Sequence, residues 1–306
     1  MPAQTAEQDT LKYTLLLALG ALLISFAPVF VKLLAAEGMT PTPLGAWRLI
    51  FGGTLLLALA LAFRKSLALS KRRWMWAALL GVIFAADLFV WHKSVIIIGA
   101  GMATILGNMQ VFFTSALGSI LYKEKLTTLF KIAVPLALAG VALLTGIGSE
   151  LEFSARYLSG VGFGLATAVI YAIYLIALKG SSHDARLSPE EKQASPLALL
   201  GWMSLVSAGL LTGAGKLEGV ALAPMTQLGW VYSFSLALIA QVLGWLAIYH
   251  SLSKLPASRA ALILLLQPTF ASIWGAILFH ETLTLLQLGG AALTLFAIYL
   301  GSARRN

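Results

Sequence analysis

The sequence predicts an all-α integral membrane protein, and composition and the length of the apolar stretches both indicate this class. Of the 306 residues, 59% are hydrophobic and 11% are charged, whereas an ordinary globular domain carries about 25% charged residues. A membrane-spanning helix needs about 20 apolar residues, and the chain holds ten such stretches. Together they use about 200 residues, which leaves no connection long enough for an independent soluble domain.

The ten predicted transmembrane helices follow one another along the whole chain. They cover residues 13–35, 43–63, 74–92, 96–121, 128–147, 158–178, 196–214, 228–249, 258–279 and 284–302. The first stretch is longer than the apolar core of a signal peptide, which has about 7–15 residues. We therefore expect it to be retained in the mature protein.

The basic residues predict the orientation, because Lys and Arg are enriched in cytoplasmic loops. With the N-terminus inside, sixteen of the 21 Lys and Arg residues lie on the inner side. The other five are Lys32, Arg48, Lys93, Arg156 and Lys216. We predict a protein of the cell inner (cytoplasmic) membrane with both termini cytoplasmic. The net charge of +9 is explained by these loops, so we expect contact with membrane lipid and no nucleic acid partner.

The chain contains an internal repeat. When it is shifted by 157 residues, segment 94–127 aligns with 251–284 and twelve of the 34 positions are identical. The matches include Gln110 with Gln267, Glu124 with Glu281, Gly118 with Gly275, Ser115 with Ser272 and Thr127 with Thr284. Apolar composition alone does not align polar residues in register, so the repeat is not a chance match.

The repeat predicts two domains, residues 1–148 and 149–306, with five spans each. Because five is odd, the second copy is inverted relative to the first. Inverted five-helix repeats are typical of secondary transporters, whose substrate site lies near the middle of the membrane between the repeats.

Several motifs then resemble a known family. They are Pro28 and Lys32 in the first span, Trp47 and Arg48 in the second, and a Gln-(13 residues)-Glu-x-Leu-Thr pattern beginning at Gln110 and at Gln267. With them the chain resembles the drug/metabolite transporter superfamily, in its EamA-like branch of ten-span exporters, and is most similar there to the aromatic amino acid exporter. The resemblance implies an exporter with spans 1–4 and 6–9 around a cavity and spans 5 and 10 outside them. Met203 stands near the position where a twin of Arg48 is expected.

Spans 3 and 8 carry the first candidate binding residues. Asp87 is the one acidic residue clearly inside a predicted span, and polar groups at membrane depth are typical of functional sites. Helical spacing places Phe84, Asp87, Leu88 and Trp91 on one face, and the repeat aligns them with Gln241, Gly244, Trp245 and Ile248. The two faces are expected to form opposite walls of a cavity. The alternatives are a structural ion pair or helix contact for Asp87 and packing or interface anchoring for the tryptophans.

Spans 4 and 6 supply the remaining candidates for substrate binding. Asn108 has no amide twin, because Leu265 occupies the equivalent position, and this asymmetry favours a ligand. Tyr171 and Tyr174 lie one turn apart, and either cavity lining or packing is compatible with that spacing.

Four further residues are interpreted as hinge or structural positions. Gln110 and Gln267 lie beside small residues, which suits close helix packing with an interhelical hydrogen bond. Pro28 and Pro268 each remove a backbone hydrogen bond and free a carbonyl at membrane depth. A hinge, a carbonyl ligand or a tolerated kink are the alternatives.

Charged residues near the predicted span ends have two interpretations. Lys32 and Arg48 either attract a carboxylate substrate or extend towards the membrane surface. Glu124 and Glu281 are expected to be structural, since each precedes a Thr that begins the next helix. Thr284 and Gln287 fit the capping-box pattern.

Missing motifs restrict the function. The sequence has no phosphate-binding G-x-x-x-x-G-K-[ST] loop, so we expect no direct use of ATP, and it has no G-x-S-x-G or H-E-x-x-H motif. The four histidines are not paired at ligand spacing, and there is no cysteine. We therefore expect no metal, no cofactor and no enzymatic activity.

Together these features predict a monomeric exporter of amino acids, aromatic ones included, and similar small metabolites. It would work by alternating access without coupling to an ion gradient. The first alternative is a proton-coupled drug/metabolite exporter that uses Asp87. A polytopic membrane enzyme acting on lipid-linked substrates and a passive channel are further alternatives.

Overall fold

The computed structural model describes residues 2–123, 126–145, 154–188, 196–224, 226–252, 254–255 and 263–302. The regular elements of these residues are all helices. They are α1 (Pro2–Ser25), α2 (Ala27–Ala36), α3 (Pro41–Ala62), α4 (Lys71–Ile98), α5 (Ala100–Asn108), α6 (Gln110–Tyr122), α7 (Thr128–Leu144), α8 (Ala155–His183), α10 (Pro196–Leu217), α11 (Gln227–Ser235), the π-helix η1 (Leu236–Gly244), α12 (Trp245–Leu252), α14 (Leu266–Phe279) and α15 (Leu285–Ser302). The predicted all-α class is confirmed.

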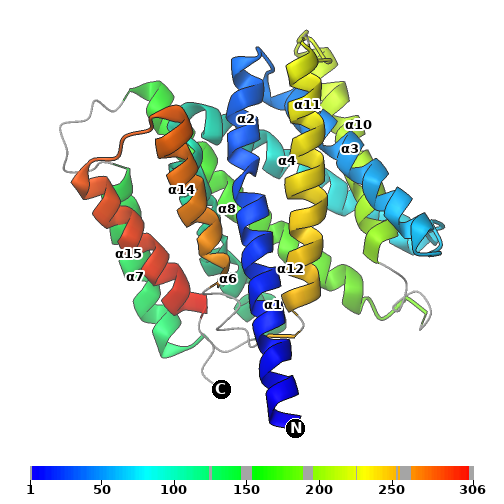
Figure 1. Ribbon diagram of the computed structural model, residues 1–306, viewed down its shortest axis with the longest axis horizontal. Helices are drawn as coiled ribbons and strands as arrows, with labels where there is room; N and C mark the ends of the chain where they lie inside the picture. Colours follow the sequence, from blue (N-terminus) through cyan, green and yellow to red (C-terminus); the bar gives the residue numbers. More distant parts are fainter. Residues whose placement is uncertain are drawn as a thin grey trace.

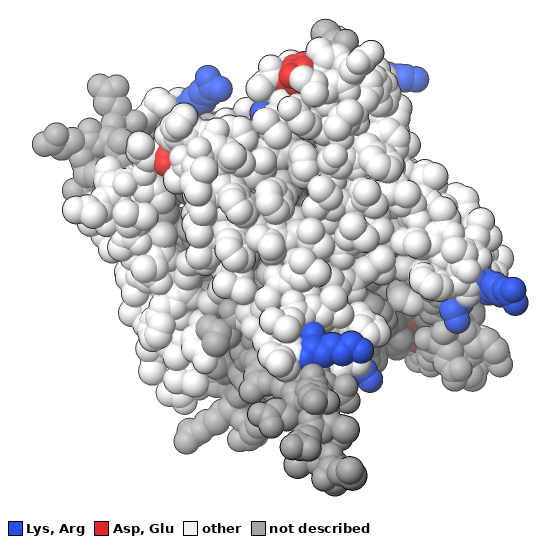
Figure 2. Space-filling view, viewed as in Figure 1, with Lys and Arg blue, Asp and Glu red and all other residues white. Residues whose placement is uncertain are grey.

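Within the described ranges, seven helical segments are long and apolar enough to cross a membrane. They are Leu11–Ala36, Pro41–Ala62, Lys71–Ile98, Ala100–Leu121, Ala155–Ser181, Pro196–Leu217 and Gln227–Ile248, and three shorter apolar helices cover Thr128–Leu144, Leu266–Phe279 and Leu285–Gly301. Figure 2 shows charged side chains at two ends of the molecule and an uncharged band between them. This surface is that of a multi-pass membrane protein. The count of ten spans and the cytoplasmic termini stay predictions.

The helices run side by side, and the ends of the bundle can be told apart in Figure 1. α1 begins and α15 ends at the lower end, whereas α2 and α14 both end at the upper end. α7 packs against α15, α3 against α10 and α4 against α8. A Cβ added to Gly140 of α7 would lie 2.5 Å from Oγ1 of Thr294 on α15. These two outer helices are therefore in direct backbone contact.

Two prolines coincide with breaks in the helices. Pro28 has no amide hydrogen to donate to Ile24, and the first span is divided at Phe26, whose N–H bonds to the carbonyl of Leu23 at 3.3 Å. Pro268 likewise lacks a donor for Leu264, and α14 begins after a turn at Leu265.

The predicted span 96–121 is divided at two places. Gly99 adopts a φ of 89°, a conformation that favours glycine, and it separates α4 from α5. A second break at Met109 separates α5 from α6. In a continuous helix Asn108 and Gln110 would project about 200° apart. The break brings both into one cavity.

The predicted capping box is confirmed at the start of α15. The N–H of Thr284 donates to Oε1 of Gln287 at 3.0 Å, and the N–H of Gln287 donates to Oγ1 of Thr284 at 3.2 Å. Thr127, the equivalent residue in the first half, accepts a hydrogen bond from the N–H of Phe130 at 3.1 Å. Glu124 lies outside the described residues.

Candidate functional site: a central cavity

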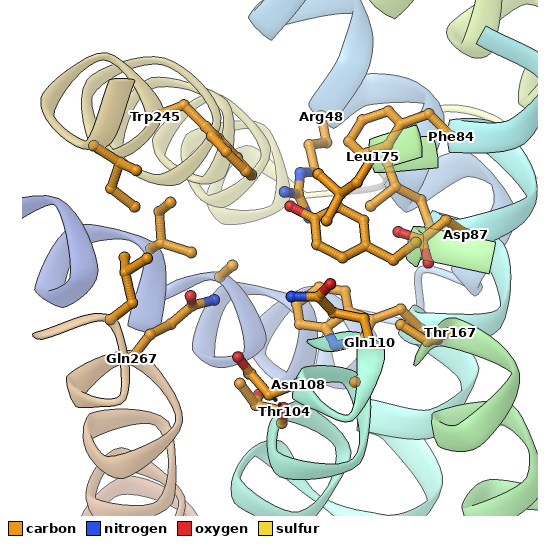
Figure 3. Close-up of a pocket in the computed structure, with 18 residues that line it drawn as sticks. Arg48, Phe84, Asp87, Thr104, Asn108, Gln110, Thr167, Leu175, Trp245 and Gln267 are labelled. Atoms are coloured by element: carbon orange, nitrogen blue, oxygen red, sulfur yellow. Dashed lines mark hydrogen bonds between the residues drawn. The ribbon is translucent and has the colours of Figure 1, made fainter. Parts of the chain in front are cut away.

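A cavity of about 310 Å³ lies inside the bundle (Figure 3). It is lined by Ile24, Ala27, Arg48, Phe84, Asp87, Leu88, Trp91, Thr104, Gly107, Asn108, Gln110, Thr167, Tyr171, Leu175, Trp245, Ile248, Leu264 and Gln267. Within the part of the chain that is described, neither α7 nor α15 contributes a lining residue. α10 also contributes none, although the family resemblance implied that the seventh span borders the cavity. α10 packs instead against α3 and α4.

Arg48 enters the cavity wall from α3. It was expected near the outer end of the second span, but it is only 5% exposed, and its guanidinium points into the cavity (Figure 3). Its Nε donates to Oε1 of Gln241 at 3.1 Å, and its Cζ lies 5.7 Å from the ring centroid of Trp91. Nη1 is buried and makes no hydrogen bond to the protein. One side of the guanidinium is therefore held while Nη1 is unpaired.

Gln241 lies behind Arg48 rather than in the cavity wall, which differs from the expected contact with substrate. A Cβ added to Gly52 would lie 2.7 Å from Cγ of Gln241, so the glutamine packs directly on the backbone of α3. From the π-helix η1, its amide oxygen accepts the hydrogen bond from Arg48. Short π-helical segments are frequent at functional sites. Gln241 thus positions the arginine.

Asp87 lines the cavity from α4 and is 5% exposed. Its Oδ1 is buried and makes no hydrogen bond to the protein. Asp87 also forms no ion pair: in the described residues the ion pairs join Lys32 to Glu281 and Arg72 to Asp184. The alternative of a structural ion pair at Asp87 is therefore not realised.

Aromatic residues surround these two charges. Phe84, Trp91 and Tyr171 line the cavity. Tyr174 does not, since its ring stacks on Tyr171 at 5.8 Å between centroids and packs against Phe84 at 5.1 Å. Its hydroxyl lies 3.5 Å from Sδ of Met203. Tyr174 supports the wall from the core instead of contacting the cavity.

The opposite wall of the cavity is largely apolar. Figure 3 shows Trp245 across the cavity from Asp87, and the lining residues Ile248 and Leu264 pack in the same apolar cluster as Trp245. Ile24 and Leu264, whose carbonyls lose a bonding partner through Pro28 and Pro268, both line the cavity. The prolines themselves are not part of the lining.

The remaining polar lining consists of amides and hydroxyls. Nδ2 of Asn108 donates to the carbonyl of Thr104 at 2.8 Å. Oε1 of Gln110 accepts a hydrogen bond from Thr114 of the same helix at 2.9 Å. Gln267 also lines the cavity. Gln110 and Gln267, expected to join helices, therefore both face the cavity.

A second polar region, the Glu281 junction, consists of Lys32, Ala100 and Glu281. Nζ of Lys32 donates to Oε1 of Glu281 at 2.5 Å, and the N–H of Ala100 donates to the two carboxylate oxygens at 3.0 and 3.1 Å. Nearby, a Cβ added to Gly101 would lie 2.6 Å from Oγ and 2.8 Å from Cα of Ser272. The junction thus joins α2, α5 and the end of α14 at the upper end of Figure 1. Lys32 is paired and is not free to take a carboxylate.

Sequence reasoning brought most of the lining residues together, but it placed Arg48 near the outer end of the second span and left open whether the residue attracts a carboxylate or extends towards the membrane surface. The signal that identifies it is the one used for Asp87, a charge well inside an apolar span. In the described residues no group of three or more His, Asp or Glu side chains is placed to hold a metal ion.

A multi-pass bundle around a central cavity with polar and apolar walls defines the class of membrane transporters for small molecules. The chain belongs to the EamA-like transporter family, whose model matches residues 11–146 and 158–303, and thereby to the drug/metabolite transporter superfamily.

Named relatives are similar to the chain in sequence, and a solved structure is similar to it in fold. Over 210 residues the chain is 27% identical to a Salmonella typhimurium protein named "Probable amino-acid metabolite efflux pump", covering 66% of this chain and 67% of the relative. It is 25% identical over 283 residues to an uncharacterized transporter of Archaeoglobus fulgidus, and the match covers 92% of this chain and 93% of that relative. A solved crystal structure has the same fold, with a TM-score of 0.66, 17% identity and coverage of 95% of this chain and 98% of that chain.

Proposed function

We propose that this protein exports amino acids, aromatic ones included, and similar small metabolites across the cytoplasmic membrane. The observation that carries the proposal is the cavity, which combines two buried charges with an apolar wall. Its volume of about 310 Å³ lies at the small end of the range for ligand pockets, about 300–1,000 Å³, and suits a molecule of amino acid size. The name of the Salmonella relative supports the same substrate class.

The transport cycle we propose is alternating access between two inverted five-span repeats, residues 1–148 and 149–306. Both termini would be cytoplasmic and the monomer would be the working unit. The Glu281 junction links Lys32 and Ala100 of the first repeat with Glu281 of the second. Breaking this junction would separate α14 from α2 and α5 and open the cavity towards that end of the bundle.

We further propose that transport runs down the substrate gradient. Asp87 is the single acidic residue among the lining residues described, which include no histidine. A proton relay through the membrane normally uses a series of such groups. The second candidate function is proton-coupled export, which the unpaired Oδ1 of Asp87 favours.

Reconstitution of the purified protein into liposomes tests the proposal. Vesicles loaded with radiolabelled tryptophan or threonine are expected to show saturable efflux without a pH gradient. Absence of flux of both compounds would contradict the amino acid assignment. If Asp87→Asn still shows tryptophan efflux at saturating substrate but loses only its stimulation by a pH gradient, the proton-coupled alternative is favoured, whereas retained stimulation would exclude a proton role for Asp87.

Single cysteines test the orientation, since the chain has no native cysteine. Ser66→Cys lies in the exposed connection between α3 and α4, and Leu217→Cys replaces a residue 92% exposed at the end of α10. In intact cells an impermeant maleimide is expected to label the cysteine at 217 and not the one at 66. The reverse pattern would invert the topology.

A further inference from the structure

We propose that the cavity binds an α-amino acid as a zwitterion, with Arg48 holding the carboxylate and Asp87 holding the ammonium group. The inference rests on the proposed function, because it names the chemical groups by which that same cavity recognises its substrate. It assigns a binding role to Arg48, and it assigns to Asp87 a ligand charge rather than a transported proton.

The first argument is charge balance. Arg48 and Asp87 are each 5% exposed and line the same cavity from neighbouring helices. Among the described residues neither has an ion-pair partner within 4.0 Å. Burying a charge without a partner is unfavourable. A ligand with one negative and one positive group would pair both charges. A ligand with a single charge would leave either Arg48 or Asp87 unpaired.

The second argument is the way Arg48 is held. Its Nε is occupied by Gln241 and its guanidinium lies over the ring of Trp91, so the group has a fixed orientation before any ligand binds. Nη1 is buried and unpaired. Guanidinium N–H groups form strong, charge-assisted hydrogen bonds with carboxylates. The arginine is therefore preorganised as a carboxylate site.

The third argument is the polarity of the two walls. Arg48 and Asp87 are the charged residues among those that line the cavity. Figure 3 shows Trp245 facing them, with Gln267 on the same side, and Ile248 and Leu264 belong to the apolar cluster in which Trp245 packs. An α-amino acid bound by both charges would direct its side chain towards this wall. An apolar or aromatic side chain fits there, whereas a third charge would be buried without a partner.

A ligand series on the wild-type protein tests the inference without any variant. Tryptophan is compared with tryptophan methyl ester, which lacks the carboxylate, and with N-acetyltryptophan, which lacks the ammonium group. Direct binding to purified protein in nanodiscs is expected to be at least about 10-fold weaker for each derivative, as expected when a charged group loses its hydrogen-bond partner. Equal affinity for the three compounds would overturn the inference.

Two substitutions assign the charges to their ligand groups. Arg48→Gln is expected to weaken tryptophan binding at least about 10-fold while leaving the affinity for the methyl ester nearly unchanged. Asp87→Asn is expected to weaken tryptophan binding by a similar factor and to leave the affinity for N-acetyltryptophan nearly unchanged. Equal weakening of tryptophan and its derivative in either variant would contradict that residue's role.

Matched controls carry the same chemical changes away from the cavity. Arg156→Gln replaces an exposed arginine, and Asp184→Asn replaces the partner of Arg72. Both are expected to bind tryptophan like wild type. If Arg48→Gln or Asp87→Asn fails to fold, as judged by gel filtration, the wild-type ligand series decides the question.

The outcomes separate this inference from the proposed function. Saturable tryptophan efflux with equal competition by the ester and the N-acetyl derivative would overturn the zwitterion site and leave the exporter proposal standing. Absence of binding and efflux for every amino acid tested would overturn both.

Discussion

The Glu281 junction and the central cavity each contain a cation and a carboxylate, but only the junction pairs them. Lys32 and Glu281 are 22% and 21% exposed and lie 2.5 Å apart. Arg48 and Asp87 are buried more deeply and remain apart. A paired charge holds helices together, whereas a buried charge with no close partner is available to a group of a ligand. The comparison distinguishes a structural contact from a binding site by pairing, not by residue type.

The largest effect is expected from giving Arg48 a protein partner. In Gln241→Glu, a carboxylate would pair with Arg48 as Glu281 pairs with Lys32. Tryptophan affinity should fall about 10- to 100-fold, because the ligand loses a charge-assisted contact, while the affinity for tryptophan methyl ester should change little. Binding to protein in nanodiscs measures both. Gln227→Glu, at an exposed residue, is the control, and unchanged tryptophan affinity in Gln241→Glu would contradict the role of Arg48.

Packing beside the junction gives the next effect. In Gly101→Ala the added Cβ would collide with the backbone of Ser272, so the free energy of unfolding should fall by about 1–3 kcal/mol. Gly162→Ala is the matched control, since no atom lies within 4 Å of a Cβ there, and it should be neutral or stabilising by up to about 1 kcal/mol. Thermal melting in detergent compares them, and equal melting temperatures would show that the α5–α14 contact is not tight.

A smaller effect is expected from weakening the junction itself. In a Thr104→Cys background, Glu281→Gln should speed labelling of the cavity cysteine from the Glu281 side about 5- to 10-fold, because the loss of an ion pair is worth about 1 kcal/mol. Glu37→Gln serves as control, because Glu37 accepts a hydrogen bond from Thr226 and forms no ion pair with any residue that the structure describes. The same labelling rate in both variants would separate the junction from access to the cavity.

The smallest effect concerns the second ion pair, at the start of α4. Hydrogen bonds from Arg72 and Trp76 lower the pKa of Asp184 from its ordinary value to about 2. Since the folded pKa lies below the unfolded value of about 3.9, the pair stabilises the protein above pH 4, and this stabilisation is lost as the pH falls towards 2. Melting of wild type and Asp184→Asn should differ at pH 5, and the difference should shrink as the pH falls through about 2. A constant difference would contradict the lowered pKa.

Much of the architecture was predictable from the sequence because it depends on local properties. Long apolar stretches and few charges predict membrane helices, and the motifs around Gln110 and Gln267 indicated the family. The helix starts at Thr127 and Thr284 were also readable, since capping involves residues three positions apart. The orientation of the faces of span 4 could not be predicted, because no proline marks the helix break at Met109.

The candidate site was only partly predictable. Asp87, Trp91 and Trp245 were identified from helical spacing and the repeat, and all three line the cavity. Tyr174 and Gln241 were predicted to line the cavity, but they lie behind its wall. Spacing identifies the face of a helix, but the depth of a side chain behind that face depends on its neighbours.

Run length, charge bias and capping are properties of adjacent residues, and they decided the membrane class, the helix starts and the family likeness. Whether a charge is paired depends on residues far apart in the chain. Gln241, which holds Arg48, is 193 positions away from it, and Glu281 is 249 positions from Lys32. Only the packing of the helices brings such residues into contact. The tertiary structure therefore decided that Lys32 belongs to a closed junction and that Arg48 faces the cavity.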